Sequence, residues 1–209
     1  MDDDIIPHFY SSSPIGFNHD ASDILDIDSI QKDQTEMTIR TVVKLGNRQL
    51  STPSEEIVDV HQAHDVLLPL VEDMKETMMA EGGVGIAAPQ IGCNKRVVIF
   101  GFESNPRYPD EASVPFTILI NPVITPLSNE MVDGWEGCLS VPRLRGLVSR
   151  YQKIKYSGYD LMGRLISREV QGFHARVVQH ECDHLDGILF PYRLKDIRQF
   201  GFEDELDYL

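Results

Sequence analysis

The stretch Gln179-His180-Glu181-Cys182-Asp183-His184-Leu185-Asp186-Gly187 decides how the rest of this sequence is interpreted. If it is helical, His180 and His184 lie one turn apart on the same face, at the separation at which two imidazoles can bind one metal ion. Glu181 lies roughly 100° around the helix from His180, so its carboxylate can act as a general base on water without being a ligand. The spacing therefore predicts a hydrolytic metal site. A chance occurrence on an amphipathic helix is the alternative, and a third ligand is needed.

Cys138 is the third ligand that we predict, in the stretch Trp135-Glu136-Gly137-Cys138-Leu139-Ser140-Val141-Pro142. A thiolate is a strong ligand for a divalent transition metal, and backbone amides can point into a site from a stretch with Gly, Ser and Pro. A buried, unreactive thiol is the alternative, because free cysteines usually lie in the core. Cys182 would point about 200° away from His180, and Cys93 follows a glycine-containing turn, so both are weaker candidates. The remaining histidines lack the spacing of a ligand: His8, His19, His61, His64 and His174.

Length and composition favour a single catalytic domain with an appendage. The chain has 209 residues, of which 42% are hydrophobic, so it can bury a sizeable core. A formal net charge of -14 argues against a mainly electrostatic contact with nucleic acid or with an anionic membrane. No apolar run reaches the roughly 18 residues of a membrane span. The chain has 3 cysteines, which are too few for a disulfide framework. We therefore expect a soluble, intracellular protein.

Residues 1–36 differ in composition from the rest of the chain. They are acidic, lack arginine and contain Lys32 as their single lysine, so we predict an irregular, weakly ordered acidic extension. A transit peptide would be rich in arginine and poor in acidic residues, so import into an organelle is not expected. The catalytic domain is predicted to cover residues 37–209. The extension either packs its apolar residues on that domain or has no function of its own.

Hydrophobic spacing predicts a first helix that begins with Asp65 as its N-cap and ends before Gly82 and Gly83. Its buried face would consist of Leu67, Leu70, Val71, Met74 and Met78. Runs rich in β-branched and aromatic residues predict strands at residues 38–43, 96–100, 116–120, 153–156 and 165–170.

The second helix, which carries the two histidines, is predicted between Gly172 and Gly187. Since most strands precede this helix, the predicted class is α+β, with one compact domain of short mixed or antiparallel sheets around it.

The glycine-rich stretch Gly83-Val84-Gly85-Ile86-Ala87-Ala88-Pro89-Gln90 is not typical of a phosphate-binding loop, because it follows a helix and lacks a Lys-Ser/Thr pair. Small residues at Gly83 and Gly85 permit close approach of another backbone, so an extended peptide could pair with this edge as an added strand. Gln90 supplies a neutral amide donor. A tight turn packed by small residues is the alternative.

Three segments together resemble the signature motifs of the peptide deformylase family, in the family's order. They are Gly83-Val84-Gly85-Ile86-Ala87-Ala88-Pro89-Gln90, Glu136-Gly137-Cys138-Leu139-Ser140 and Gln179-His180-Glu181-Cys182-Asp183-His184. The resemblance covers residues 37–193 and implies a compact α+β fold with the metal helix at its centre. It implies an enzyme that removes the formyl group from formyl-methionyl nascent polypeptides and releases formate. It also implies one divalent metal ion, usually Fe(II), with zinc, nickel or cobalt able to occupy the same ligands.

Residue by residue, the resemblance assigns a role to each of these motif positions. The metal ligands would be Cys138, His180 and His184. Glu181 would transfer the proton, and the oxyanion donors would be the Gln90 side chain and the Leu139 backbone amide. Substrate-binding residues would be Gly83, Val84, Gly85 and Ile86 of the first motif. Val177 lies outside the three motifs and is added because it precedes His180 by one helical turn on nearly the same face. Of these, Val84, Ile86 and Val177 are predicted to line the pocket for the methionine side chain, although ordinary core packing explains an apolar residue at each position equally well.

The sequence departs from the family at both ends. Some bacterial members end in a basic helix that touches the ribosome, whereas residues 202–209 are acidic, so docking by that route is not expected. The acidic extension is likewise not part of the family pattern. Because initiation with formylmethionine is bacterial or organellar, and no transit peptide is visible, we expect a bacterial cytoplasmic protein without direct contacts to nucleic acid or membrane.

Two other classes of function compete with this prediction. A metalloprotease with the same helix motif would need a further His or Glu ligand downstream, and Glu203 and Glu205 lie in an acidic tail without a helix to present them. A non-catalytic module that binds formylated or free N-termini would be expected to have lost Glu181, Gln90 or a ligand. All of these residues are present.

Overall fold

The computed structural model describes residues 38–206, so the predicted extension 1–36 lies outside the described residues. The α-helices are α1 (His64–Ala80) and α2 (Gly172–Leu185). The strands are β1 (Gly85–Ala87), β2 (Val97–Phe102), β3 (Val114–Pro126), β4 (Met131–Cys138), β5 (Val141–Tyr151), β6 (Lys153–Tyr159), β7 (Leu165–Gln171) and β8 (Phe200–Phe202). Short 3-10 helices are η3 (Arg48–Ser51), η4 (Ala88–Ile91), η5 (Phe190–Arg193), η6 (Ile197–Gln199) and η7 (Glu203–Glu205). The predicted α+β class is confirmed.

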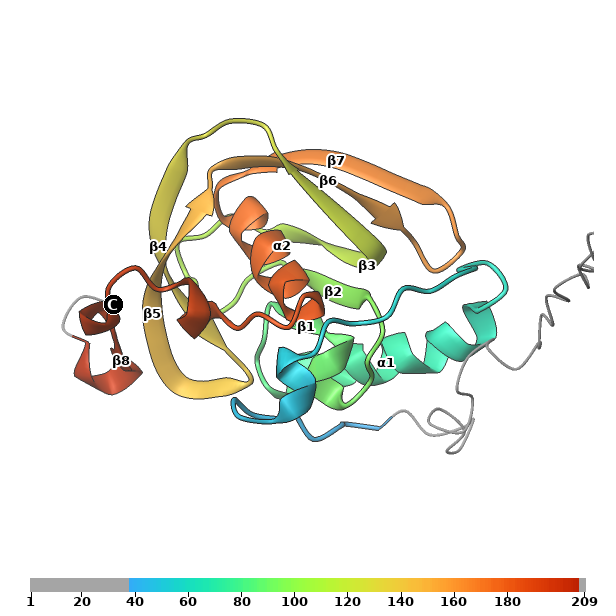
Figure 1. Cartoon of the computed structure of the whole chain (residues 1–209), viewed down its shortest axis with the longest axis horizontal. Coiled ribbons are helices and arrows are strands. Elements are labelled where there is room, and N and C mark those ends of the chain that lie inside the picture. The colour runs from blue at the N-terminus through green and yellow to red at the C-terminus, as the bar shows by residue number, and fades with distance from the viewer. Residues whose placement is uncertain (1–37, 207–209) are drawn as a thin grey trace, which may run out of the picture. The chain divides into compact units, whose positions relative to one another are not determined.

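The larger sheet has the strand order β1-β2-β3-β6-β7, and all neighbouring strands are antiparallel. Its strand β2 is buried on both faces, because successive side chains point to opposite sides of a strand. Val97 and Ile99 pack in one core cluster with α1, whereas Val98 and Phe100 pack in another with α2. Figure 1 shows α2 enclosed by strands of both sheets. This arrangement places the helix with the two histidines at the centre of the described fold.

The smaller sheet, β4-β5-β8, carries Cys138 at the last position of β4. We did not predict β4 and β5 from the sequence. Glycines such as Gly134 and Gly146 weaken the strand signal, and their missing side chains leave room for the side chains of Arg176 and Leu194, respectively, which a Cβ would displace. A third core cluster holds this sheet against η5, and its buried members are Leu50, Cys138, Val141, Val148, Leu189 and Phe190.

Two local predictions near the start of the described chain were wrong. Residues 38–43 form no strand, because their backbone donors find isolated partners in place of a neighbouring strand: Arg40 donates to the Thr77 hydroxyl and Val43 to the Gln90 carbonyl. Asp65 is not the N-cap of α1, since Ala63 takes that position and Asp65 lies in the first turn. The predicted buried face of α1 is confirmed.

Helix α2 ends as the sequence predicts. Its C-cap is Asp186, and the following Gly187 has φ +72. The amide of Ile188 donates back to the carbonyl of Asp183, which satisfies a carbonyl at the helix end. A Cβ on Gly187 would lie 2.8 Å from the carbonyl carbon of Ser51, so glycine is required both for the backbone angle and for close packing.

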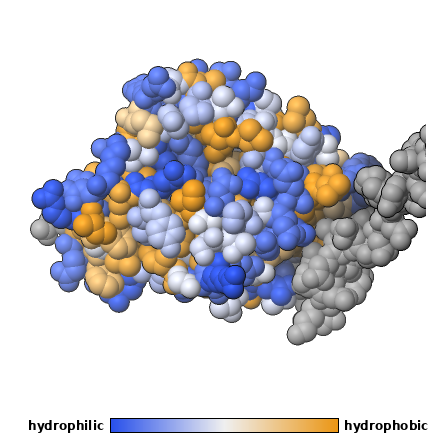
Figure 2. Space-filling model, in the orientation of Figure 1, coloured by the Kyte–Doolittle hydropathy of each residue, from blue (hydrophilic) through white to orange (hydrophobic). Residues whose placement is uncertain are grey.

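Hydrophobic and hydrophilic residues are interspersed on the face drawn in Figure 2. Within the described part of the chain, no helix is long and apolar enough to cross a membrane.

Candidate metal centre and active site

A buried group of three side chains, the Cys–His–His group, consists of Cys138, His180 and His184. One ligand atom of each residue lies within 4.8 Å of the others. The Sγ of Cys138 is 3.3 Å from Nε2 of His184. The α-helical spacing of α2 brings the two imidazoles together, with ring centroids 5.2 Å apart, while the end of β4 presents the thiol. Segments far apart in the sequence therefore meet at one point that could hold a metal ion.

The weaker ligand candidates lie elsewhere. Cys182 packs in the core cluster between α2 and the larger sheet, where burial raises the pKa of its thiol far above the ordinary value. His174 packs against the rings of Phe100 and Tyr156, with its ring centroid 5.9 Å from each of theirs. Its pKa is lowered, chiefly by burial and then by Arg168. Both residues are explained by packing in the core.

Glu181 lies next to this group and against the backbone of β1. A Cβ on Gly85 would overlap the Glu181 carboxylate, so only glycine lets the carboxylate approach this strand. Among the described residues, its buried Oε2 atom has no hydrogen-bond partner. Burial is the main cause that raises the pKa of Glu181 to about 7. A carboxyl group with such a pKa can both accept and donate a proton near neutral pH.

Glu136 orients the first histidine, a role that we did not predict although Glu136 lies in the second motif. Its Oε2 atom is 2.8 Å from Nδ1 of His180, which leaves Nε2 of that ring free to bind a metal. Arg150 donates to both carboxylate oxygens at 2.9 Å, and Arg176 donates to Oε1 at 2.9 Å. Burial alone would raise the pKa of Glu136, but hydrogen bonds from Arg150 and His180 hold it well below its ordinary value.

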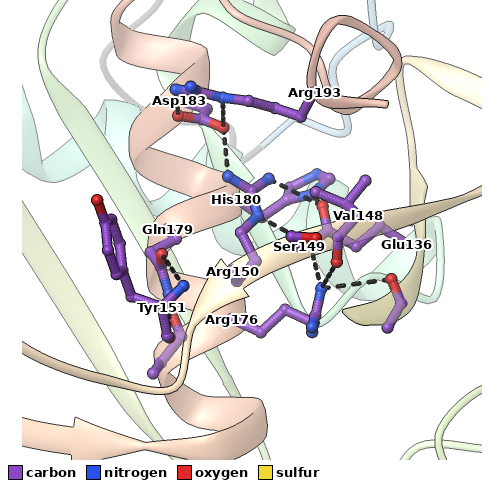
Figure 3. Close-up of polar contacts among 12 residues, drawn as sticks. Glu136, Val148, Ser149, Arg150, Tyr151, Arg176, Gln179, His180, Asp183 and Arg193 are labelled. Atoms are coloured by element: carbon purple, nitrogen blue, oxygen red, sulfur yellow. Dashed lines mark hydrogen bonds and ion pairs between the residues drawn. The ribbon is translucent and has the colours of Figure 1, made fainter. Parts of the chain in front are cut away.

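A chain of ion pairs continues from Glu136 to the surface. Arg150, on β5, also contacts Asp183 on α2 at 2.5 Å, and Asp183 accepts two hydrogen bonds from Arg193. Figure 3 shows these side chains beside α2. Charged side chains usually face solvent, so the sequence signal for Arg150 and Asp183 as buried partners is weak. The pairs hold β4, β5 and η5 against the helix that carries the histidines.

The variant Glu136→Gln is expected to lose stability and metal affinity together. The amide keeps the volume but leaves the charges of Arg150 and Arg176 without their buried counter-ion, which costs about 3 kcal/mol of unfolding free energy. A thermal melt should show a midpoint lower by about 10 °C. Metal affinity should fall about 10-fold to 100-fold, because His180 loses the carboxylate that fixes its ring. The exposed Glu130→Gln, with the same charge change, is the control. Equal behaviour of both variants would contradict this role.

Gln90 and Leu139 both line the pocket beside the thiol of Cys138. The Gln90 Nε2 atom donates to the Ser140 hydroxyl at 3.1 Å and lies 3.5 Å from Cys138 Sγ, while its Oε1 accepts from the Ala87 amide at 2.8 Å. These contacts hold the amide nitrogen toward the Cys–His–His group. Leu139 is the residue after Cys138, in the turn between β4 and β5, and its carbonyl accepts from Lys44 Nζ at 2.9 Å.

A pocket opens in front of the Cys–His–His group. Four of the five predicted substrate-binding residues line it, namely Gly83, Val84, Gly85 and Val177. Ile86 does not, because alternate side chains of β1 point to opposite faces and Ile86 is fully buried in the cluster with α1. The pocket also has lining residues that we did not predict: Arg107, Tyr108, Trp135, Glu136, Gly137, Phe173 and Arg176.

The charges of this site suit a divalent cation. Burial opposes a positive charge on His180, but Cys138 and Glu136 outweigh it and raise the pKa of His180 well above its ordinary value. The surroundings of the His180 ring therefore favour a positive charge there. Burial, together with the neighbouring His180, keeps the pKa of His184 well below its ordinary value, which favours its neutral form. One thiol and two imidazoles are a ligand set typical of zinc and similar transition metals.

A soft ligand triad, an adjacent carboxylate and a pocket in front of them define a metal-dependent hydrolase. The sequence pattern of the polypeptide deformylase family matches residues 39–200. The chain belongs to this family, whose members depend on a metal ion and remove the N-formyl group from nascent peptides.

Individual relatives agree with this assignment. A peptide deformylase 1 of Nitrosomonas europaea is 54% identical over 168 residues, covering 80% of this chain and 94% of its own length. A peptide deformylase 1 of Bordetella pertussis is 56% identical over 170 residues, with the same two shares. The Met-Ala-Ser-bound crystal structure of the class I type b peptide deformylase of Acinetobacter baumannii aligns with a TM-score of 0.73 at 41% identity, covering 76% of this chain and 100% of the other.

Proposed function

We propose that Cys138, His180 and His184 bind the metal ion of this deformylase, and that the native ion is Fe(II). The observation that carries the proposal is the buried position of three suitable ligand atoms within 4.8 Å of one another. The choice of Fe(II) follows the resemblance to the family, and the same ligands suit zinc, nickel and cobalt.

Glu181, Gln90 and Leu139 are the proposed catalytic residues. When bound, the metal ion polarises the formyl carbonyl and lowers the pKa of water. Glu181 takes the proton of the attacking water on Oε2, the atom for which the described residues offer no hydrogen-bond partner, and passes it to the departing amine, which yields formate and a free amino terminus. Gln90 Nε2 and the Leu139 amide stabilise the oxyanion of the tetrahedral intermediate, an effect worth about 3 kcal/mol per donor.

The substrate is proposed to bind as an extended peptide along β1. This strand lies at the edge of its sheet and pairs with β2 on one side, so its other side is available to a further strand. Gly83 and Gly85 permit the close approach, and Val84 and Val177 line the pocket for the methionine side chain. The Acinetobacter baumannii structure with bound Met-Ala-Ser supports a peptide of this kind as the ligand.

Two measurements on one preparation test the proposal. Purified protein should contain about one divalent metal ion per chain, and it should release formate from formyl-Met-Ala-Ser. Removal of the metal with a chelator should abolish formate release, and Fe(II) should restore it. Cleavage of unformylated peptides in place of deformylation would instead indicate a metalloprotease, and binding of the formyl peptide without turnover would indicate a non-catalytic module.

We place the protein in the bacterial cytoplasm, where formylated chains emerge from the ribosome. The relatives described above are bacterial. The described segment after α2 contains short 3-10 helices and β8, and its last described helix η7 is acidic, so we do not propose a ribosome contact through a basic helix of this segment. With a net charge of -14, direct binding to nucleic acid or to an anionic membrane is not proposed.

A shortened protein that begins at Met37 should keep its fold and its rate of formate release. The first described residues are already held on α1, because the Thr38 amide donates to Asp73 at 2.9 Å and Arg40 pairs with Asp73 at 2.6 Å. None of the proposed catalytic or binding residues precedes them. We therefore propose residues 37–209 as the catalytic domain and 1–36 as an extension.

Thermal melts and formate release of the full-length and shortened proteins check this boundary. A shortened protein that is insoluble, or more than about tenfold slower, equivalent to about 1.4 kcal/mol, would show that residues 1–36 belong to the working enzyme.

A further inference from the structure

The loop of residues 103–113, between β2 and β3, forms one side of the pocket entrance. Its Asn105 side chain donates to the carbonyl of Gly82, next to the pocket residue Gly83. Its Tyr108 ring lies 4.8 Å from the ring of Phe173 in the first turn of α2, and the Tyr108 hydroxyl accepts from Arg145 at 3.1 Å. The loop is thus held on both sides of the pocket.

Arg107 lies between these two anchors and lines the pocket. Its backbone amide is bonded to the Asn105 side chain at 2.9 Å, but among the described residues its guanidinium makes no hydrogen bond or ion pair. The other charged residues that line the pocket are paired or buried. Arg176 and Glu136 pair with each other, and Glu181 lies buried beside the Cys–His–His group. Arg107 is therefore an exposed cation at the pocket without a partner in the described part of the chain.

We infer that Arg107 is a specificity-determining residue that favours formyl peptides with an acidic side chain at the second or third position. The inference rests on the proposed placement of the peptide along β1. With the formyl group at the Cys–His–His group and the methionine side chain in the pocket, the next residues leave the pocket at its entrance. A carboxylate there meets the guanidinium of Arg107, which can bind it with two parallel hydrogen bonds.

Arg107 is a positive charge in a protein that is negatively charged overall. The protein carries a net charge of -14, which disfavours acidic peptides at long range. Glu103, Asp110 and Glu111 lie on the same loop, but none of them lines the pocket. A pair exposed to solvent contributes little, so the expected preference is about threefold and should weaken as salt is added.

The experiment compares amidated peptides that differ only in one charge. Formyl-Met-Asp-Ser amide is compared with formyl-Met-Asn-Ser amide, and formyl-Met-Ala-Asp amide with formyl-Met-Ala-Asn amide, by kcat/KM for formate release. In at least one pair, the acidic-to-neutral ratio should fall about threefold in Arg107→Gln relative to the unchanged protein, mainly through KM. The control is Lys155→Gln, which removes the same charge from exposed Lys155 on β6, three strands away from β1 in the sheet order.

Two results would overturn the inference while the proposed function stands. One is a ratio that is the same in Arg107→Gln and in the unchanged protein for both pairs. The other is an equal change in Lys155→Gln, which would assign the preference to the overall charge. The neutral peptides test the proposed function separately, since absence of formate from them would overturn that function and this inference with it. Normal turnover of the neutral peptides with unaltered ratios would overturn the inference alone.

Discussion

Replacing Glu181 with glutamine is expected to reduce kcat for formate release about a thousandfold, equivalent to about 4 kcal/mol, while the protein keeps its metal ion. The amide has nearly the volume of the carboxylate, so it fits beside Gly85, but it cannot take up the proton of water. The Cys–His–His group is unchanged in this variant. Metal content and kcat, measured on the same sample, separate the two effects. Parallel loss of metal and rate would show that Glu181 maintains the site and does not transfer the proton.

The same variant has an expected effect on stability, measured on protein stripped of metal with a chelator. Burial raises the pKa of Glu181 from 4.5 to about 7. Because the folded-state pKa is the higher one, the unfolded chain loses this proton first, and stability falls as pH rises from about 4.5 through 7. The amide of Glu181→Gln does not ionise, so this variant avoids the burial of a charged carboxylate. Above pH 7 it should therefore be more stable than the unchanged protein by up to about 3 kcal/mol. A variant that is less stable than the unchanged protein at pH 8 would contradict this explanation.

Much of the fold follows from local patterns in the sequence. The β-branched runs in β2, β3, β6 and β7 lie in the larger sheet, where hydrophobic side chains face α1 or α2. The buried face of α1 follows from its 3.6-residue spacing. Residues 38–43 show where this reasoning fails, because β propensity describes a side chain's fit on a sheet and does not supply a neighbouring strand.

The smaller sheet could not be predicted in this way. Its buried residues include Glu136, Arg145 and Arg150, whose charges look like a solvent-exposed pattern in the sequence. They are buried because each finds a partner from a distant segment, as Arg145 does with Glu203 at 2.7 Å. Such pairs depend on tertiary structure, and the sequence does not specify them locally.

The candidate site likewise has some residues that local sequence patterns predict and others that depend on tertiary contacts. Helical spacing brings His180 and His184 together, and the motif around Cys138 supplies the thiol that the structure places beside them. Ile86, which we predicted to line the pocket, packs in the cluster with α1, because the sequence does not tell which face of a three-residue strand looks toward α2. Arg107 and Tyr108 were missed because their loop reaches the pocket only through its contacts with Gly82 and Phe173.

Replacing Cys138 with serine is expected to abolish stable metal binding at micromolar metal and, with it, formate release. The hydroxyl of serine is a poor substitute for the soft thiolate, so affinity should fall by more than about a thousandfold, equivalent to about 4 kcal/mol. The fold should persist, because serine is nearly isosteric with cysteine and Cys138 lies at the end of β4. A thermal melt of the chelator-treated proteins checks this point.

The matched control is Cys182→Ser, which makes the same substitution on α2 between the two histidines. Cys182 packs in the core, so its replacement by a hydroxyl should cost about 1–3 kcal/mol of stability and leave metal content and formate release intact. Cys138→Ser should therefore lose metal but keep its melting temperature, whereas Cys182→Ser should keep its metal but melt at a lower temperature. If Cys138→Ser retains a full equivalent of metal, the thiol is not a ligand. Among the described residues that line the pocket, Glu181 would then be the one acidic group that no arginine holds, and hence the next candidate for a ligand.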